Sequence, residues 1–259
     1  MAERKIRLTL CYDGSYASGW QIQPDVITFQ GLLEEALFRI TSERLRVTGA
    51  SRTDRGVHAL EQVATFKTSS HHPPEVFHRA LNGILPPFIR VLSACYCEDE
   101  FHPRFSASSK EYVYLLENSS VRTPFLLRYA GYVKGGLDVD AMRKACKYLI
   151  GKRDFKAFQA SGCSAKTTIR ELKRLGIREC DEIEFLSMPL KGRFLVFYFE
   201  ADAFLRYMVR NIVGTLIEVG LGRYSPERVG QILQSRDRRQ AGPTAPAEGL
   251  YLFRIHYRV

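Results

Sequence analysis

The sequence lacks the features that would mark a membrane, secreted or metal-binding protein. Its longest strongly apolar run, residues 194–199, is far shorter than the roughly 20 residues that a membrane helix needs, and the first residues hold no apolar signal core. The 6 cysteines form no CxxC pair and the 6 histidines form no HExxH motif. We therefore expect a reduced, cytoplasmic protein with no membrane association and no metal site.

The composition is that of a folded globular protein. Of its 259 residues, 45% are hydrophobic and 25% are charged, which excludes disorder, collagen and a coiled coil and provides for one large or two modest domains. The formal net charge of +10 favours a polyanionic partner.

Much of this charge falls in residues 143–178, where aromatic residues at 148, 155 and 158 interleave with the basic ones. That pattern is typical of a surface that neutralises an RNA backbone and stacks on bases, and a solvated basic face is the alternative. The stretch holds only two acidic residues, Asp154 and Glu171. Its basic residues are Arg143, Lys144, Lys147, Lys152, Arg153, Lys156, Lys166, Arg170, Lys173, Arg174 and Arg178.

Hydrophobic periodicity predicts two similar halves. The first runs strand, helix, strand, strand, helix, strand, and the second repeats strands and helices in a similar way. The predicted strands are 6–12, 45–48, 62–67, 89–92, 112–116, 169–177, 194–200 and 251–255, and the predicted helices begin after Thr28, at Pro74, at Asp138 (to residue 150), at Phe204 (to residue 219) and after Ser225. We expect an α+β fold with a half at residues 1–108 and a half at residues 109–259.

One loop places a carboxylate between two arginines. In Ser51-Arg52-Thr53-Asp54-Arg55-Gly56, the guanidinium groups should keep Asp54 ionised. Spacing alone leaves two interpretations open: a structural ion-pair turn, or a carboxylate nucleophile or base in a phosphate-attracting pocket.

Two further features have a structural and a functional interpretation. Arg206 and Arg210 fall within or beside the apolar stripe of the predicted helix 204–219. Each therefore needs either an anionic partner or a side chain whose stem packs on the core while its charged head reaches water. Tyr112 and Tyr114 flank Val113 on a predicted strand, so their rings face the same way, either as packing residues or to stack on a base.

Seven local strings, in order, resemble those of the tRNA pseudouridine synthases of the TruA type. They are residues 12–15 with 19–24, 30–31, 52–59 (Arg-Thr-Asp-Arg-Gly-Val-His-Ala), 101–107, 154–158, 208–211 and 241–246. The chain departs from the family at Ser51 and Arg55 beside the aspartate, at Pro103 and at Lys110-Glu111.

The resemblance implies a role for each matched residue. Asp54 is the catalytic aspartate, Tyr112 stacks on the target uracil, and Arg210 pairs with the aspartate. Further substrate-binding residues are Arg52, Arg104, His58 and Phe158.

The resemblance also implies an architecture and a substrate. The expected fold has two related ferredoxin-like halves that form one continuous, mainly antiparallel sheet with a central basic cleft. The expected enzyme is a homodimer that isomerises uridines in the anticodon arm of tRNA, at tRNA positions 38–40, without a metal or an organic cofactor. A non-catalytic RNA-binding α+β protein is the alternative, and a nucleotide hydrolase would require a second working carboxylate.

Overall fold

The computed structural model describes residues 3–163, 165–185 and 187–258 and divides the chain into two compact units. Unit 1 comprises Met1–Ser108 and Tyr251–Val259, and unit 2 comprises Ser109–Leu250. The last strand belongs with unit 1, whereas the sequence analysis assigns it to the second half, because strand pairing that distant along the chain leaves no local pattern.

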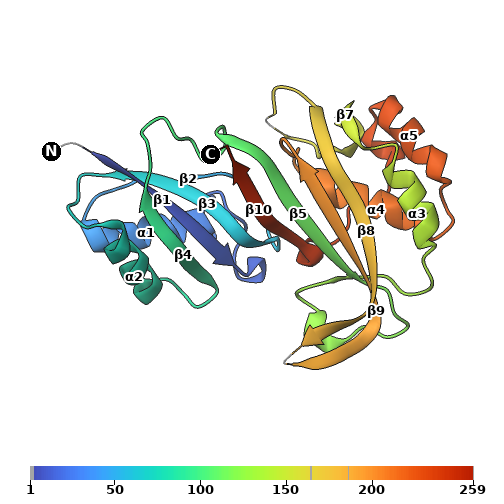
Figure 1. The fold of residues 1–259 in the computed structure, drawn as a ribbon, viewed down its shortest axis with the longest axis horizontal. Helices are drawn as coiled ribbons and strands as arrows, with labels where there is room; N and C mark the ends of the chain where they lie inside the picture. Colours follow the sequence, from blue (N-terminus) through green and yellow to red (C-terminus); the bar gives the residue numbers. More distant parts are fainter. Residues whose placement is uncertain (1–2, 164, 186, 259) are drawn as a thin grey trace. The chain divides into compact units, whose positions relative to one another are not determined.

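Unit 1 is a sheet with two helices (Figure 1). The strand order is β4-β1-β3-β10, with β2 beside β3; β1 is antiparallel to both neighbours, and β10 runs parallel to β3. The elements are β1 (Arg4–Tyr12), η1 (Gly14–Tyr16), α1 (Phe29–Thr41), β2 (Thr48–Gly49), β3 (His58–Thr68), α2 (Pro74–Ile84), β4 (Ile89–Tyr96) and β10 (Leu250–Tyr257).

The local sequence explains these elements. Alternate residues of β1 are buried, as its apolar-polar alternation predicts. The Thr28 hydroxyl accepts a hydrogen bond from the Gly31 N–H at 3.3 Å and so caps α1. The core of the unit includes Phe29, Leu33 and Phe77, which are 0% exposed.

Unit 2 has a long antiparallel sheet, β5-β9-β8-β7, with β6 parallel to β5, and three helices that pack on one another (Figure 1). Its elements are β5 (Ala107–Glu117), η2 (Pro124–Leu126), β6 (Gly131–Tyr132), α3 (Val139–Cys146), β7 (Gly151–Asp154), η3 (Lys156–Phe158), β8 (Ile169–Phe185), β9 (Met188–Ala201), α4 (Met208–Gly220), α5 (Pro226–Ser235), η4 (Arg238–Gln240) and η5 (Ala247–Gly249). The predicted α+β class, with mainly antiparallel strands, is confirmed.

Two predicted helices are shorter in the structure. The α3 helix ends at Cys146, because residues 147–149 bond three residues back and tighten into a turn. The α4 helix begins at Met208 rather than Phe204, because Tyr207 has φ 62° and a left-handed residue cannot continue a right-handed helix. Arg206 therefore lies outside the helix and is exposed, so its predicted place in the apolar stripe is wrong. The predicted strand 45–48 also differs, because the strand found there, β2, has only the two residues Thr48–Gly49 and shares one residue with the prediction.

The helices of the described residues are short. The longest, α1 and α4, have 13 residues each. Within the described part of the chain, no helix combines the length and apolar character needed to cross a bilayer.

Candidate functional site

The loop that carries Asp54 connects β2 to β3 and is fixed to unit 1 by backbone hydrogen bonds. The Trp20 N–H donates to the Thr53 carbonyl at 3.0 Å, and the Gly56 N–H donates to the Gly14 carbonyl at 3.2 Å. The Val57 N–H closes a turn onto the Asp54 carbonyl at 3.1 Å. Ordered bonds on both sides of Asp54 hold its backbone in one conformation.

Two glycines permit this close packing. A Cβ on Gly14 would lie 2.2 Å from the Val57 carbonyl oxygen, and a Cβ on Gly19 would lie 2.6 Å from the Thr53 carbonyl oxygen. Gly19 also has φ 93°, in the region that L side chains rarely adopt. The chain segment that follows β1 therefore approaches the Asp54 loop more closely than any other residue type would permit.

The loop alternates buried and accessible side chains. Ser51 and Thr53 are 7% and 6% exposed, whereas Arg52 and Arg55 are exposed and Asp54 is partly buried. The buried side chains anchor the loop, so Asp54 and the flanking guanidinium groups are directed toward the surface of the loop. A partly buried carboxylate in a loop that also carries two exposed arginines is a setting in which the carboxylate can be used chemically.

His58, a predicted substrate-binding residue, is an internal support. It is 3% exposed, its ring stacks on Tyr251 at 4.7 Å between centroids, and its Nδ1 accepts a hydrogen bond from the Gly14 N–H at 3.1 Å. Nδ1 also lies 3.2 Å from Oδ1 of Asp13. These contacts leave the side chain almost no surface for a substrate, and they tie the start of β3 to the turn that follows β1.

Arg104, by contrast, lies on an exposed loop after β4. Its guanidinium lies 5.5 Å from the centroid of the Phe105 ring, and Phe105 is 75% exposed. The loop is shaped by His102, whose Nδ1 accepts from the Arg104 N–H at 3.1 Å. An exposed arginine beside an exposed aromatic ring is suited to contact an RNA backbone and an unstacked base.

In unit 2, Tyr112 lies on β5 opposite Phe199 of β9. The ring is 8% exposed and meets Phe204 in an edge-to-face contact at 5.0 Å. Tyr114, two residues on, is 0% exposed and donates to the Pro246 carbonyl at 3.0 Å. The shared face predicted for the two tyrosines agrees with their both being buried, and Tyr114 is a packing residue.

Arg210 lies in the first turn of α4 and is held at two points. Its Nε donates to the Ala245 carbonyl at 2.7 Å, and its guanidinium lies 4.8 Å from the centroid of the Tyr207 ring. The Ala245 N–H donates back to the Arg210 carbonyl at 3.0 Å. The guanidinium is therefore oriented within unit 2 by the Ala245 carbonyl and by the ring of Tyr207, the residue just before the helix.

The segment 241–246 is fixed to α4 by a residue that the sequence analysis missed. Arg238 donates to Asn211 Oδ1 at 3.0 Å, to Thr244 Oγ1 at 3.1 Å and to the Gly242 carbonyl at 3.0 Å. Burial lowers the pKa of its guanidinium from the usual value. Arg238 stands just before a recognisable string of small residues, but nothing in its local pattern distinguishes it from the many surface arginines.

Phe158 is also an internal residue rather than a substrate contact. Its side chain is 0% exposed, and its carbonyl accepts a hydrogen bond from Asn211 Nδ2 at 2.8 Å. Phe155 is likewise 0% exposed, which leaves Tyr148, at 40%, as the exposed ring among the three aromatics of the basic stretch. The expectation that all three rings stack on bases is wrong, because the two phenylalanines pack into unit 2.

The basic stretch itself lies at the surface. Ten of its eleven basic side chains are exposed and Arg170 is partly buried. They are distributed over α3, β7, η3 and β8 and the connections between these elements. Exposed cations of this density are suited to contact successive phosphates.

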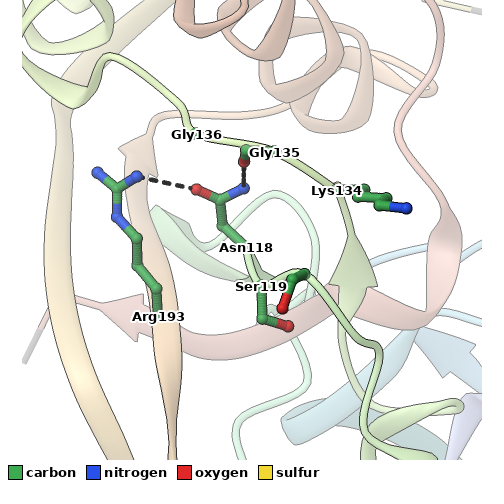
Figure 2. Close-up of a pocket in the computed structure, with 7 residues that line it drawn as sticks. Asn118, Ser119, Lys134, Gly135, Gly136 and Arg193 are labelled. Atoms are coloured by element: carbon green, nitrogen blue, oxygen red, sulfur yellow. Dashed lines mark hydrogen bonds between the residues drawn. The ribbon is translucent and has the colours of Figure 1, made fainter.

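A separate hollow of about 320 Å³ lies in unit 2 among the residues that follow β5, Arg193 of β9 and the segment that precedes α3 (Figure 2). Figure 2 shows the Asn118 side chain between Arg193, whose Nη1 donates to Asn118 Oδ1 at 3.1 Å, and the Gly135 carbonyl, to which Asn118 Nδ2 donates. Arg193 also donates to Glu179 Oε2 at 2.6 Å. These polar groups hold the surrounding chain together, and the residues that line the hollow include none of the predicted site residues.

Comparison with known proteins supplies the family. A family model described as tRNA pseudouridine synthase matches residues 11–106 and 145–258. A tRNA pseudouridine synthase A of Thermoanaerobacter sp. is 43% identical over 254 residues, which are 98% of this chain and 100% of that protein.

Other relatives agree. The tRNA pseudouridine synthase A of Pelobacter propionicus is 42% identical, with 98% of this chain and 100% of that protein covered, and the one of Nitrosomonas eutropha is 44% identical, with 98% and 87% covered. The matched residues include the Asp54 loop and α4. The chain belongs to the tRNA pseudouridine synthase family.

Proposed function

We propose that this protein converts uridine to pseudouridine in the anticodon arm of tRNA. The observation that carries the proposal is the 43% identity to a tRNA pseudouridine synthase A over the full length of that protein. The predicted substrate residues Arg52 and Arg104 are exposed, as contact with RNA requires, and the exposed basic stretch of unit 2 provides cations for the tRNA backbone. The choice of the anticodon arm rests on the resemblance of the sequence motifs.

The reaction rearranges one nucleotide without a co-reactant. The N1–C1′ bond of uridine breaks, the uracil turns, and a C5–C1′ bond forms while the hydrogen on C5 leaves as a proton and N1 gains one. No atom is lost from the nucleotide apart from this proton exchange, and nothing is oxidised. The residues that carry the chemistry must therefore cleave a glycosidic bond and retain the detached base.

Asp54 is the proposed catalytic residue. A carboxylate can add to the nucleotide as a nucleophile, or remove the C2′ proton as a base, and both routes require it to be ionised at neutral pH. Arg52 and Arg55 flank it in sequence, and the backbone bonds of Thr53, Asp54 and Gly56 fix the loop that presents it. Arg210 is proposed as the cation that pairs with this carboxylate.

Base recognition is proposed for Tyr112. A uridine inside a stem or a stacked loop must be extruded, at a cost of a few kcal/mol. Stacking on an aromatic ring returns about 1–3 kcal/mol. The ring of Tyr112 is held by Phe204 and by its strand partner Phe199, so little side-chain freedom would be lost when a base stacks on it.

The assembly and location of the enzyme are further parts of the proposal. The resemblance implies a homodimer that works in the cytoplasm. Sedimentation equilibrium of the purified protein tests the dimer, and a monomer at micromolar concentration would contradict it.

The activity is tested with a tRNA transcript that carries tritium at C5 of uridine. The wild-type protein should release tritium to water, whereas Asp54→Asn should release none and keep its tRNA affinity within about threefold, because the amide cannot act as nucleophile or base. Asp99→Asn is the matched control, since it makes the same change at a unit 1 carboxylate that lies 3.0 Å from the Lys67 ammonium and has no proposed role, and it should keep the wild-type rate. Binding without tritium release by the wild type would instead indicate a non-catalytic RNA-binding protein.

A further inference from the structure

Gln62 is a buried amide at a place where a strand would ordinarily hold an apolar residue. It is 0% exposed in β3, and the two residues that follow it, Val63 and Ala64, are buried apolar residues. Burying an amide is costly unless its polar atoms find hydrogen-bond partners. The partners of the amide therefore indicate the structural role of Gln62.

Both polar atoms of the Gln62 side-chain amide form hydrogen bonds with the loop that carries Asp54. Nε2 donates to the Ser51 carbonyl at 2.7 Å, and Oε1 accepts from the Ser51 N–H at 3.2 Å. The side chain thus occupies both backbone groups of Ser51, much as a neighbouring strand would. Ser51 is three residues before Asp54.

A second path runs through Tyr12. Nε2 of Gln62 also donates to the Tyr12 hydroxyl oxygen at 3.2 Å, and the Tyr12 and Thr53 hydroxyl groups are 2.7 Å apart. Either hydroxyl group can be the donor in this contact. The Tyr12 ring is 5% exposed and stacks on Phe29 at 3.9 Å between centroids, so this hydroxyl cannot move freely.

An irregularity in the sheet accompanies this arrangement. Leu10 pairs with Gln62, but Tyr12, two residues on, pairs with Ala59, so β3 has one residue more than β1 between these pairs. Such bulges redirect side chains and are common beside active sites. Here the bulge lies between the two strand residues whose side chains reach the loop.

We propose that Gln62 and Tyr12 are positioning residues for catalysis: their buried hydrogen bonds to Ser51 and Thr53 set the position of the Asp54 carboxylate. This inference rests on the proposed function of the chain. Neither residue touches the substrate, so their loss should slow the chemical step and leave tRNA binding intact. A displacement of about 1 Å in a reacting group can reduce the rate about a hundredfold.

The test replaces polar groups at constant volume. Gln62→Met removes the amide, and Tyr12→Phe removes the hydroxyl group. Asn82→Leu is the matched control, because the Asn82 amide also occupies both backbone groups of one residue: Nδ2 donates to the Val91 carbonyl at 2.8 Å and Oδ1 accepts from the Val91 N–H at 2.9 Å. Asn82 lies on α2 and joins it to β4, elements that do not carry the Asp54 loop.

The rate is measured by tritium release with enzyme in excess over tRNA, well below the melting temperature of each variant, together with the dissociation constant for tRNA. Gln62→Met and Tyr12→Phe should each lower the single-turnover rate at least about tenfold and change tRNA affinity less than about threefold. Asn82→Leu should lower the melting temperature but keep the wild-type rate. The double variant with Gln62→Met and Tyr12→Phe should lose less than the product of the two single losses, because both act on one network.

Wild-type rates in Gln62→Met and Tyr12→Phe, or an equal loss of rate in Asn82→Leu, would overturn the inference while the proposed function stands. If Gln62→Met does not fold, Tyr12→Phe carries the test, since it removes a single oxygen from a side chain that keeps its packing on Phe29. A wild-type protein that releases no tritium would overturn both the proposed function and this inference.

Discussion

Gly19→Ala should destabilise unit 1 and slow catalysis, because the added methyl group would clash with the backbone of the Asp54 loop. Gly19 has φ 93°, and an added Cβ would lie 2.6 Å from the Thr53 carbonyl oxygen and 3.0 Å from the Asp54 carbonyl carbon. A left-handed backbone costs an L residue about 1–2 kcal/mol, and forcing a methyl group into a packed site adds about 1–3 kcal/mol. We therefore expect the free energy of unfolding to fall by about 2–5 kcal/mol.

Gly135→Ala provides the matched control. Gly135 has φ 94°, and apart from its chain neighbours no atom of the described residues lies within 4 Å of the position that its Cβ would take. This variant should therefore lose only the backbone contribution of about 1–2 kcal/mol. Urea unfolding followed by far-ultraviolet circular dichroism measures both variants. The fluorescence of Trp20, the single tryptophan of the sequence, reports unit 1.

The steric contact also predicts a kinetic effect. Because the clash is with the peptide between Thr53 and Asp54, Gly19→Ala should lower the rate of pseudouridine formation at temperatures where the protein remains folded, and Gly135→Ala should not. Equal destabilisation by the two substitutions, with the wild-type rate retained in both, would refute the reasoning that Gly19 is required by the Asp54 loop.

Two further predictions concern charge and ionisation. Lys152→Gln combined with Arg153→Gln should weaken tRNA binding and reduce the slope of log affinity against log salt by about 1–2. Lys67→Gln is the control and should leave this slope unchanged, because the Lys67 ammonium lies 3.0 Å from Asp99. An unchanged slope in the double variant would contradict a docking face on β7. Burial raises the pKa of the Cys146 thiol to about 12, so Cys146 should resist iodoacetamide at pH 8 in the folded protein. The pKa of the Cys163 thiol is lowered by hydrogen bonds that outweigh its burial, so Cys163 should react. Mass spectrometry of the labelled peptides distinguishes the two, and labelling of Cys146 before unfolding would contradict its burial.

Much of the fold follows from local pattern. The alternation of β1, the cap at Thr28 and the proline that begins α2 each act within a few residues, and all three elements occur where the sequence predicts them. The start of α4 could not be found in this way. It depends on one left-handed residue, Tyr207, which the helical periodicity of its neighbours conceals.

The site was only partly predictable for a similar reason. The Asp54 loop is recognisable as a string, but burial is a property of the folded unit. Phe158 and His58 are in the interior, although Phe158 comes two residues after an exposed lysine and His58 three residues after an exposed arginine. Gln62 acts through partners 11 to 50 residues away, and Arg238 reaches Asn211, 27 residues away. No local signal marks such distant hydrogen bonds.

The most direct test of the central claim maps the modified nucleotide. An unmodified tRNA transcript is incubated with the wild-type protein or with Asp54→Asn, treated with a carbodiimide that stays attached to pseudouridine after mild alkali, and copied by reverse transcriptase. The wild-type reaction should produce stops at uridines of the anticodon arm, and Asp54→Asn should produce none. The absence of stops with the wild-type protein, or equal stops with Asp54→Asn, would contradict the account.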